Sequence, residues 1–217
     1  MKLEILRLKD NTDNFVKKKK QTFDLPMRLL MTGKTGMGKT NILSNLLLND
    51  NKEFYRKDFD PENIFIFSNS LAGDRKLKII IKELDIPEEN LFEKYNEEIV
   101  EVIYDMLVDN YNESIEDKEK PRHSLLIFDD VSFDGSLKGK EKESQMNRIF
   151  MNGRKFLISA IATAQKYSSF GTGLRENASA LILGKSSKKQ LELIEADHNY
   201  LKDKKMFREM FLSNTKD

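Results

Sequence analysis

The chain has 217 residues, 34% of them charged and 39% hydrophobic, which is typical of a globular α/β domain with a full core. The absence of cysteine excludes disulfides and thiolate zinc sites, and two histidines are too few to favour a histidine metal site. With a net charge of +1, any contact with nucleic acid must come from a local patch. The first ten residues contain no apolar run of the length of a signal peptide or membrane span, so we expect no membrane association.

The amino-terminal part, residues 1–26, is expected to be an edge strand followed by a polar link, with the main domain at residues 27–217. Residues 1–10 alternate apolar and charged side chains, as an edge strand does. The link contains four consecutive lysines, Lys17–Lys20. Such a run is either a solvated loop or a contact with a phosphate backbone or an acidic partner.

A glycine-rich turn lies between a predicted strand and a predicted helix within residues 27–48. Apolar residues precede the turn, and apolar residues at helical spacing follow it. The turn reads GKTGMGKT and matches G-x-x-x-x-G-K-[ST], the pattern of a phosphate-binding loop. The predicted nucleotide-binding residues are Gly33, Lys34, Thr35, Gly36, Met37, Gly38, Lys39, Thr40 and Asn41.

The chemistry of this loop predicts a nucleoside triphosphate and Mg²⁺ as its ligands. Glycines let backbone N–H groups turn toward a triphosphate at the positive end of the following helix. Lys39 is predicted to reach the β- and γ-phosphates, and the Thr40 hydroxyl to join the Mg²⁺ shell. The base-reading pattern N-K-x-D of GTPases is absent, because Asn51-Lys52 is followed by Glu53-Phe54.

A second strand is predicted at residues 63–68, NIFIFS, which are almost entirely apolar. Helices are predicted from Gly73-Asp74 to Leu84 and from Glu97 to Tyr111. The charged segment 109–121 is expected to be a surface loop.

Two adjacent carboxylates follow a third predicted strand, in the sequence HSLLIFDDV of residues 123–131. Ligand sites of α/β proteins lie at the carboxyl ends of strands. Asp129 is predicted to hold Mg²⁺, and Asp130 to orient or deprotonate the attacking water. The lysine-containing segment 132–144 that follows is either a DNA-contacting loop or a polar insertion.

A fourth strand is predicted at residues 154–165, with Arg154 at its start and Gln165 at its tip. Gln165 is expected beside Asp130, where its amide would bind the γ-phosphate or the water. A fifth strand is predicted at Ala180–Leu183 and helical structure at residues 187–212, with packing contacts from Leu191, Ile194, Phe207 and Met210. Five buried strands with long crossovers predict an α/β fold with a mainly parallel sheet covered on both faces.

Residues 27–185 resemble the genome-packaging ATPases of poxviruses and other large DNA viruses, in the FtsK/HerA superfamily of additional-strand P-loop ATPases. The resemblance depends on the phosphate loop and on four further features: the Asp129–Asp130 pair, Gly153-Arg154, Gln165, and Arg175 with Asn177. The chain departs from that pattern at Lys155, where many relatives have histidine, and at Asp130, where the wider superfamily commonly has glutamate.

The resemblance implies a three-layer RecA-like P-loop fold and a Mg²⁺-dependent ATPase. It further implies a homo-oligomeric ring, a pentamer or hexamer, that moves double-stranded DNA into a preformed capsid at its packaging vertex, in the host cytoplasm. An arginine finger from the neighbouring subunit is implied, with Arg154 as first candidate and Arg175 as second.

We also expect translocation without nuclease activity, because only about thirty residues follow the fifth strand and they hold no two-metal acid cluster. Two other functions stay open at this point. One is a nucleotide-dependent assembly or scaffolding protein, and the other is a cellular DNA helicase or pump of the same superfamily.

Overall fold

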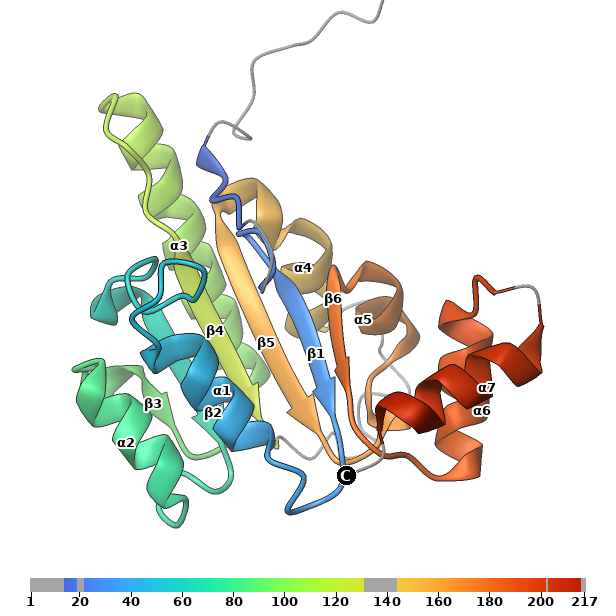
Figure 1. Ribbon diagram of the computed structural model, residues 1–217. Coiled ribbons are helices and arrows are strands. Elements are labelled where there is room, and N and C mark those ends of the chain that lie inside the picture. Colours follow the sequence, from blue (N-terminus) through green and yellow to red (C-terminus); the bar gives the residue numbers. More distant parts are fainter. Residues whose placement is uncertain (1–13, 19–21, 131–143, 202, 216–217) are drawn as a thin grey trace, which may run out of the picture.

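The computed structural model describes residues 14–18, 22–130, 144–201 and 203–215, which form a three-layer α/β fold around one sheet (Figure 1). The sheet has six strands in the order β3-β2-β4-β5-β1-β6, and every neighbouring pair is parallel. The strands are β1 Arg28–Thr32, β2 Ile64–Ser68, β3 Leu91–Phe92, β4 Ser124–Asp129, β5 Ile158–Ala164 and β6 Ala180–Leu183. The predicted α/β class with a parallel sheet is therefore confirmed.

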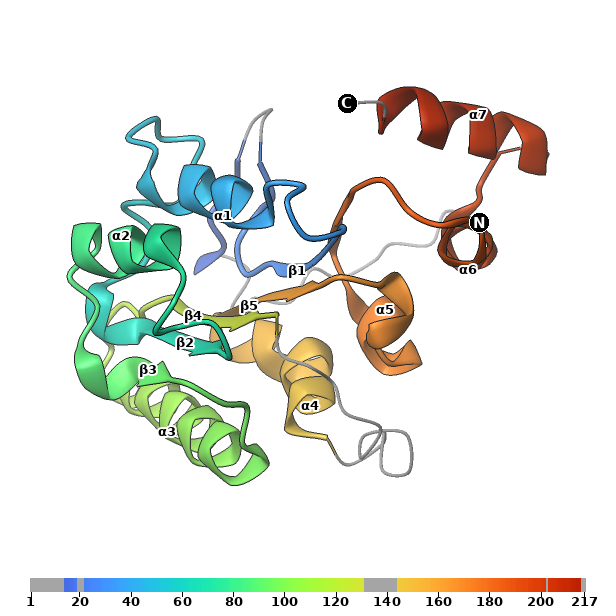
Figure 2. The ribbon, with the colours of Figure 1, turned by 90° about the horizontal axis from the view of Figure 1, so that it is seen from below.

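Helices cover both faces of the sheet, as its connections require. Figures 1 and 2 show α1 and α2 on one face, α3, α4 and α5 on the other, and α6 and α7 beyond the β6 edge. The helices are α1 Lys39–Leu48, α2 Arg75–Glu83, α3 Glu97–Glu116, α4 Gln145–Asn152, α5 Thr172–Asn177, α6 Lys188–His198 and α7 Lys204–Asn214. Within the described ranges, no helix combines the length and the apolar character that crossing a membrane requires.

The core is divided by the sheet into two apolar clusters. Leu29 and Met31 of β1 pack toward α1 and α2, whereas Leu30 packs toward α3 and α4. Successive side chains of a strand point to opposite faces, so a strand buried on both faces must be apolar throughout. This burial explains why the central strands are visible in the sequence as continuous apolar runs.

Two strand predictions are corrected. The sheet has a sixth strand, β3, which was missed because it is only 2 residues long and shows no periodicity. The fourth predicted strand begins at Ile158 rather than at Arg154, because Gly153–Phe156 forms a 3₁₀ turn and Leu157 has a positive φ of 57°. Arg154 therefore lies in the turn that precedes the strand.

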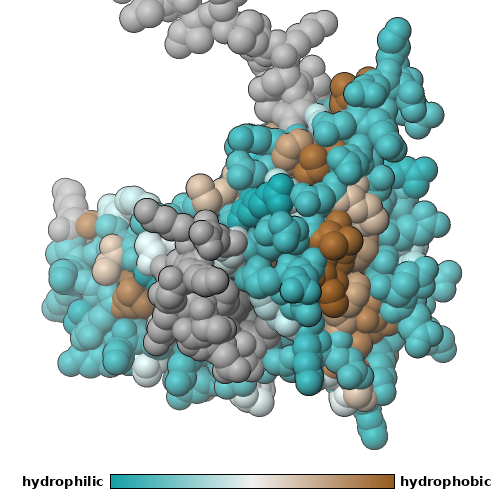
Figure 3. Space-filling model, turned by 180° about the vertical axis from the view of Figure 1, so that it is seen from behind, coloured by the Kyte–Doolittle hydropathy of each residue, from teal (hydrophilic) through white to brown (hydrophobic). Residues whose placement is uncertain are grey.

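Two helix predictions are also corrected. Helix α3 continues to Glu116, into the predicted loop 109–121, because residues 109–116 contain no glycine or proline and their charges face solvent. Figure 3 shows the largely hydrophilic surface on this side of the molecule. The segment 187–212 is two helices, and Phe211 packs in the core where Met210 was expected, since Met210 is 45% exposed.

The predicted edge strand at residues 1–10, Lys19, Lys20 and segment 132–143 lie outside the described residues. The other two lysines of the run form ion pairs: Lys17 with Asp24 at 2.9 Å, and Lys18, whose side chain is 4% exposed, with Asp58. The interpretation of the run as a phosphate contact is therefore not supported for Lys18. Instead, this side chain ties the segment before β1 to the connection between α1 and β2.

Candidate active site at the carboxyl edge of the sheet

The phosphate loop connects β1 to α1 at the carboxyl edge of the sheet. Gly36 and Gly38 have φ values of 86° and 84°, a left-handed conformation that glycine adopts without the strain a side chain would bring. Gly38 is also the N-cap of α1, so the free N–H groups of this helix point into the loop. The Lys39 ammonium donates a hydrogen bond to the Gly33 carbonyl oxygen at 2.8 Å. The loop thus has the shape and charge of a phosphate cradle.

Some of the other predicted loop residues line the cleft, and others lie outside it. Thr35, Thr40 and Asn41 line the cleft above the loop, whereas Lys34 is exposed and is not among the lining residues. Met37 packs beside Gly184, where an added Cβ would lie 2.7 Å from the Met37 methyl carbon. This contact fixes the outer side of the loop against the segment that follows β6.

The acid pair lies two strands away from β1. Asp129, the last residue of β4, is 4% exposed and accepts hydrogen bonds from the hydroxyls of Thr163 at 2.8 Å and Ser68 at 3.3 Å. The next residue, Asp130, has a positive φ of 45°, and its backbone N–H donates to the Thr163 hydroxyl at 2.9 Å. Strained backbone conformations of this kind concentrate at functional sites. Thr163 therefore positions both carboxylates.

Gln165 lies beside Asp130 at the same carboxyl edge of the sheet, the position predicted for it. It follows β5, which stands between β1 and β4, and its side-chain amide donates to an Asp130 carboxylate oxygen at 3.3 Å. Strands lie about 4.8 Å apart, so the intervening strand separates the phosphate loop from the acid pair by roughly 10 Å. That gap leaves room for phosphate groups, a metal ion and an attacking water.

The sequence did not identify the part of the cleft lining that lies before and at the start of α2, or Thr163, which binds the acid pair. The lining residues missed there are Ser70, Gly73, Asp74, Arg75 and Lys76. The cleft has a volume of about 500 Å³ and includes Asp74, whose carboxylate accepts from the Thr40 hydroxyl at 3.3 Å. Asp74 also caps α2 by accepting from the N–H groups of Lys76 and Leu77. The position before a helix is a signal for capping only. Its contact with Thr40, 34 residues earlier, is a product of the fold.

The residues present fit a magnesium ion. Mg²⁺ prefers oxygen ligands and is held by one or two protein groups together with substrate phosphates. The Thr40 hydroxyl and the Asp129 carboxylate line one cleft with the phosphate loop, and they supply such ligands. Among the described residues, no three carboxylate or imidazole groups converge on a metal position. Thr40 and Asp129 are the residues that would hold Mg²⁺ here.

The two finger candidates lie outside their own cleft. Arg154 is at the opposite, amino-terminal edge of the sheet, with its guanidinium over the Phe15 ring at 4.8 Å. Arg175 is partly buried and donates to the Asp197 carboxylate at 2.7 Å and to the Phe170 carbonyl at 2.9 Å. Tyr167 donates to the same carboxylate at 3.0 Å. Arg175 thus belongs to a packing network within its own subunit, whereas the Arg154 guanidinium is exposed.

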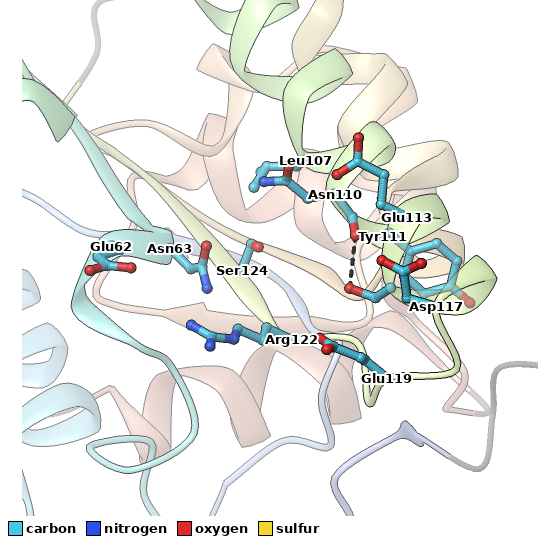
Figure 4. Close-up of a pocket in the computed structure, with 11 residues that line it drawn as sticks. Glu62, Asn63, Leu107, Asn110, Tyr111, Glu113, Asp117, Glu119, Arg122 and Ser124 are labelled. Carbon is cyan, nitrogen blue, oxygen red and sulfur yellow. Dashed lines mark hydrogen bonds between the residues drawn. The ribbon is translucent and has the colours of Figure 1, made fainter.

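Another hollow at the amino-terminal edge is acidic and differs from the cleft. It has a volume of about 320 Å³ between the end of α3 and the starts of β2 and β4. Figure 4 shows four acidic side chains around it, Glu62, Glu113, Asp117 and Glu119, with Arg122. Its acidic lining is unsuited to a triphosphate, whereas the cleft at the carboxyl edge includes Lys39 and the phosphate loop.

The sequence matches one protein family over nearly its whole length. The family model described as Poxvirus A32 protein matches residues 13–216, nearly the whole sequence. The chain belongs to the Poxvirus A32 protein family. This membership confirms the predicted resemblance to a poxvirus protein family. No curated protein sequence matches the chain.

Solved structures share the fold of this A32 family member at low sequence identity. One is EssC (ATPases 2 and 3) from Geobacillus thermodenitrificans, with a TM-score of 0.55, 16% identity, and coverage of 81% of this chain and 35% of that one. The chain thus spans about a third of the EssC chain.

Another is the genome packaging NTPase B204 from Sulfolobus turreted icosahedral virus 2 in complex with AMP. Its TM-score is 0.56 at 13% identity, with 78% of this chain and 81% of that chain covered. The same NTPase in complex with ATP-gammaS has a TM-score of 0.51 at 11% identity, with 88% and 86% covered. These similarities establish the RecA-like P-loop fold.

Asp129 is expected to destabilise the nucleotide-free subunit. Burial raises the pKa of its carboxyl above the ordinary value of 3.8, and the hydroxyls of Thr163 and Ser68 offset only part of that effect. An acid whose folded pKa is raised does not lower the free energy of unfolding at pH values well below its unfolded pKa of 3.8. The destabilisation grows as pH rises from 3.8 to the folded pKa, and it is constant above the folded pKa. Asp129→Asn should therefore unfold at higher denaturant concentration than wild type at pH 7, with the difference vanishing in acid. A variant less stable than wild type at pH 7 would contradict this account.

Arg175 is expected to contribute mainly to stability. Arg175→Ala removes a charged hydrogen bond to Asp197 and should lower the free energy of unfolding by about 1–3 kcal/mol. Chemical denaturation measures this loss, and exposed Lys166→Ala is a matched control that should stay near wild type. Wild-type stability in Arg175→Ala, together with lost hydrolysis, would instead indicate a catalytic role.

Proposed function

We propose that this chain is the subunit of a homo-oligomeric ATPase ring, a pentamer or hexamer, that drives double-stranded viral DNA into a preformed capsid. The observation that carries the proposal is the meeting of the phosphate loop, the Asp129–Asp130 pair and Gln165 at one sheet edge in an A32 family chain. The B204 structure with ATP-gammaS, described as a genome packaging NTPase, supports ATP as the substrate.

In this proposal each residue of the cleft has a separate role in ATP hydrolysis. Lys39 contacts the β- and γ-phosphates, and Thr40, which bonds to Asp74 in this structure, would hold Mg²⁺ together with Asp129. When bound, Mg²⁺ neutralises charge that develops on the phosphate oxygens. Asp130 orients the attacking water and takes its proton, and Gln165, already bonded to Asp130, holds the water in line.

The ring completes the site in the same proposal. Arg154 of one subunit approaches the γ-phosphate held by the next, which explains why it lies away from its own cleft. The ring works at the packaging vertex in the host cytoplasm, and it moves DNA without cutting it.

The direct test is ATP hydrolysis by the purified chain with and without linear double-stranded DNA. We expect hydrolysis that requires Mg²⁺, rises on addition of DNA, and leaves the DNA at full length on a gel. Hydrolysis that DNA does not stimulate, with no DNA binding, would remove the translocase part and favour an assembly role. Strand separation in the same reaction would favour a helicase.

A further inference from the structure

A basic pocket lies at the amino-terminal edge of the sheet, opposite the nucleotide cleft. It has a volume of about 300 Å³, and its lining includes Arg28, Arg154, Lys17, Phe15 and Ser179. Arg28 is the first residue of β1, and Arg154 lies in the turn before β5. Because β1 and β5 are adjacent parallel strands, the fold brings these two guanidinium groups to one pocket.

Arg28 is held firmly but lacks a counter-charge. Its backbone N–H donates to the Ser179 hydroxyl at 2.8 Å, and its Nη1 donates to the Phe150 carbonyl at 3.1 Å. Its Nε is buried and has no hydrogen-bond partner in the described ranges. Arg28 as a whole is half-buried, so the cost comes from a partly desolvated charge without a carboxylate partner and from a buried Nε–H without an acceptor. Such a group usually reflects a missing partner.

Arg154 adds a second positive charge to the same pocket. Within the described residues, neither Arg28 nor Arg154 lies within 4.0 Å of a carboxylate. The one acidic side chain of the lining, Asp24, already accepts from the Lys17 ammonium at 2.9 Å and from the Lys18 N–H at 2.8 Å. Burial and the nearby Arg154 charge both lower the pKa of Arg28. An anion between the two guanidiniums would relieve both effects.

We propose that this pocket binds a phosphate group, with Arg28 and Arg154 as its ligands. A phosphate carries up to about two negative charges and offers several acceptor oxygens, which match two forked guanidinium donors. Two sources share this chemistry: free orthophosphate, and the terminal phosphate of a nucleotide held by a neighbouring subunit. The free-phosphate source does not depend on ring formation, and the second source rests on the ring of the proposed function.

Orthophosphate binding to the Lys39→Ala chain tests the first source, because that change weakens the competing phosphate loop. Isothermal titration calorimetry should detect binding that Arg28→Gln or Arg154→Gln, each added to Lys39→Ala, weakens at least tenfold. Arg122→Gln is the matched control, since Arg122 lies at the same edge but pairs with Asp60 at 3.2 Å. Equal binding by all four chains would overturn the assignment of these ligands.

A subunit-mixing experiment tests the second source if Lys39→Ala binds no orthophosphate. Arg28→Gln subunits keep an intact phosphate loop, and Lys39→Ala subunits keep an intact basic pocket. Hydrolysis by their mixture above the sum of the separate chains supports a phosphate supplied by the neighbour. No phosphate binding and no restored hydrolysis together overturn the proposal. Arg28→Met repeats each arm if Arg28→Gln unfolds, and DNA-stimulated hydrolysis by wild type tests the proposed function separately.

Discussion

Replacing Asp130 with asparagine is expected to lower kcat for ATP hydrolysis by about 10²–10⁴-fold while ATP binding is retained. The amide cannot accept the proton of the attacking water, although its size is nearly that of the carboxylate. The backbone should tolerate the change, because asparagine is among the residues that adopt the left-handed conformation found here, with φ of 45°. Steady-state hydrolysis and binding of a fluorescent ATP analogue measure the two effects.

The chain supplies a close control for this variant. Asp85 also has a positive φ, 53°, but is exposed at the end of α2, away from the cleft. Asp85→Asn should keep wild-type kcat. The Asp130→Asn variant also separates two functions, because a motor should lose DNA packaging while a nucleotide-dependent assembly protein should keep its role. Unchanged kcat in Asp130→Asn would remove Asp130 from the water-activating role.

Replacing Arg154 with alanine is expected to lower ATP hydrolysis by the assembled ring by about 10³–10⁵-fold, without loss of subunit stability. The reason is that the guanidinium is exposed, has no ion-pair partner among the described residues, and stacks only on Phe15. Its loss removes charge stabilisation from a neighbour's transition state but breaks little within its own subunit. Nucleotide affinity of the separate subunit should therefore stay near wild type.

Mixing subunits shows whether Arg154 acts across an interface. Arg154→Ala subunits combined with Lys39→Ala subunits should hydrolyse ATP faster than either alone, since some interfaces then pair an intact loop with an intact arginine. Lys155→Ala is the matched control, because this neighbouring cation is exposed and bonds to Asn152 within its own subunit. If assembled mixtures restore no hydrolysis, Arg154 does not act in trans.

Arg154 and Arg175 show that a sequence pattern can name candidates for the arginine finger but cannot distinguish their surroundings. Both arginines match the family pattern, and the sequence placed Arg154 first, at the start of a predicted strand, and Arg175 second. The fold separates them: Arg175 is bound to Asp197 at 2.7 Å, while Arg154 is free of carboxylates among the described residues. Asp197 comes 22 residues later in the chain, so no local pattern could reveal the ion pair.

The sequence by itself determined the phosphate loop, the two carboxylates at the carboxyl end of β4 and the glutamine after β5. Each depends on a short contiguous stretch, in which glycine conformations or a buried apolar run control where the next side chain lies. The same local rules missed β3 and shortened α3, because a 2-residue strand and a charged, solvent-facing helix carry little periodicity.

The tertiary structure alone decided which distant residues complete the site. Thr163 reaches Asp129 across 34 positions, and Asp74 reaches Thr40 across the same separation, because parallel strands bring their carboxyl ends to one edge. The same sheet gathers Arg28 and Arg154 at the other edge. The shape of the phosphate loop is thus determined by its own residues. The contact of Thr163 with the acid pair, the contact of Asp74 with Thr40, and the basic pocket all depend instead on the order of the strands.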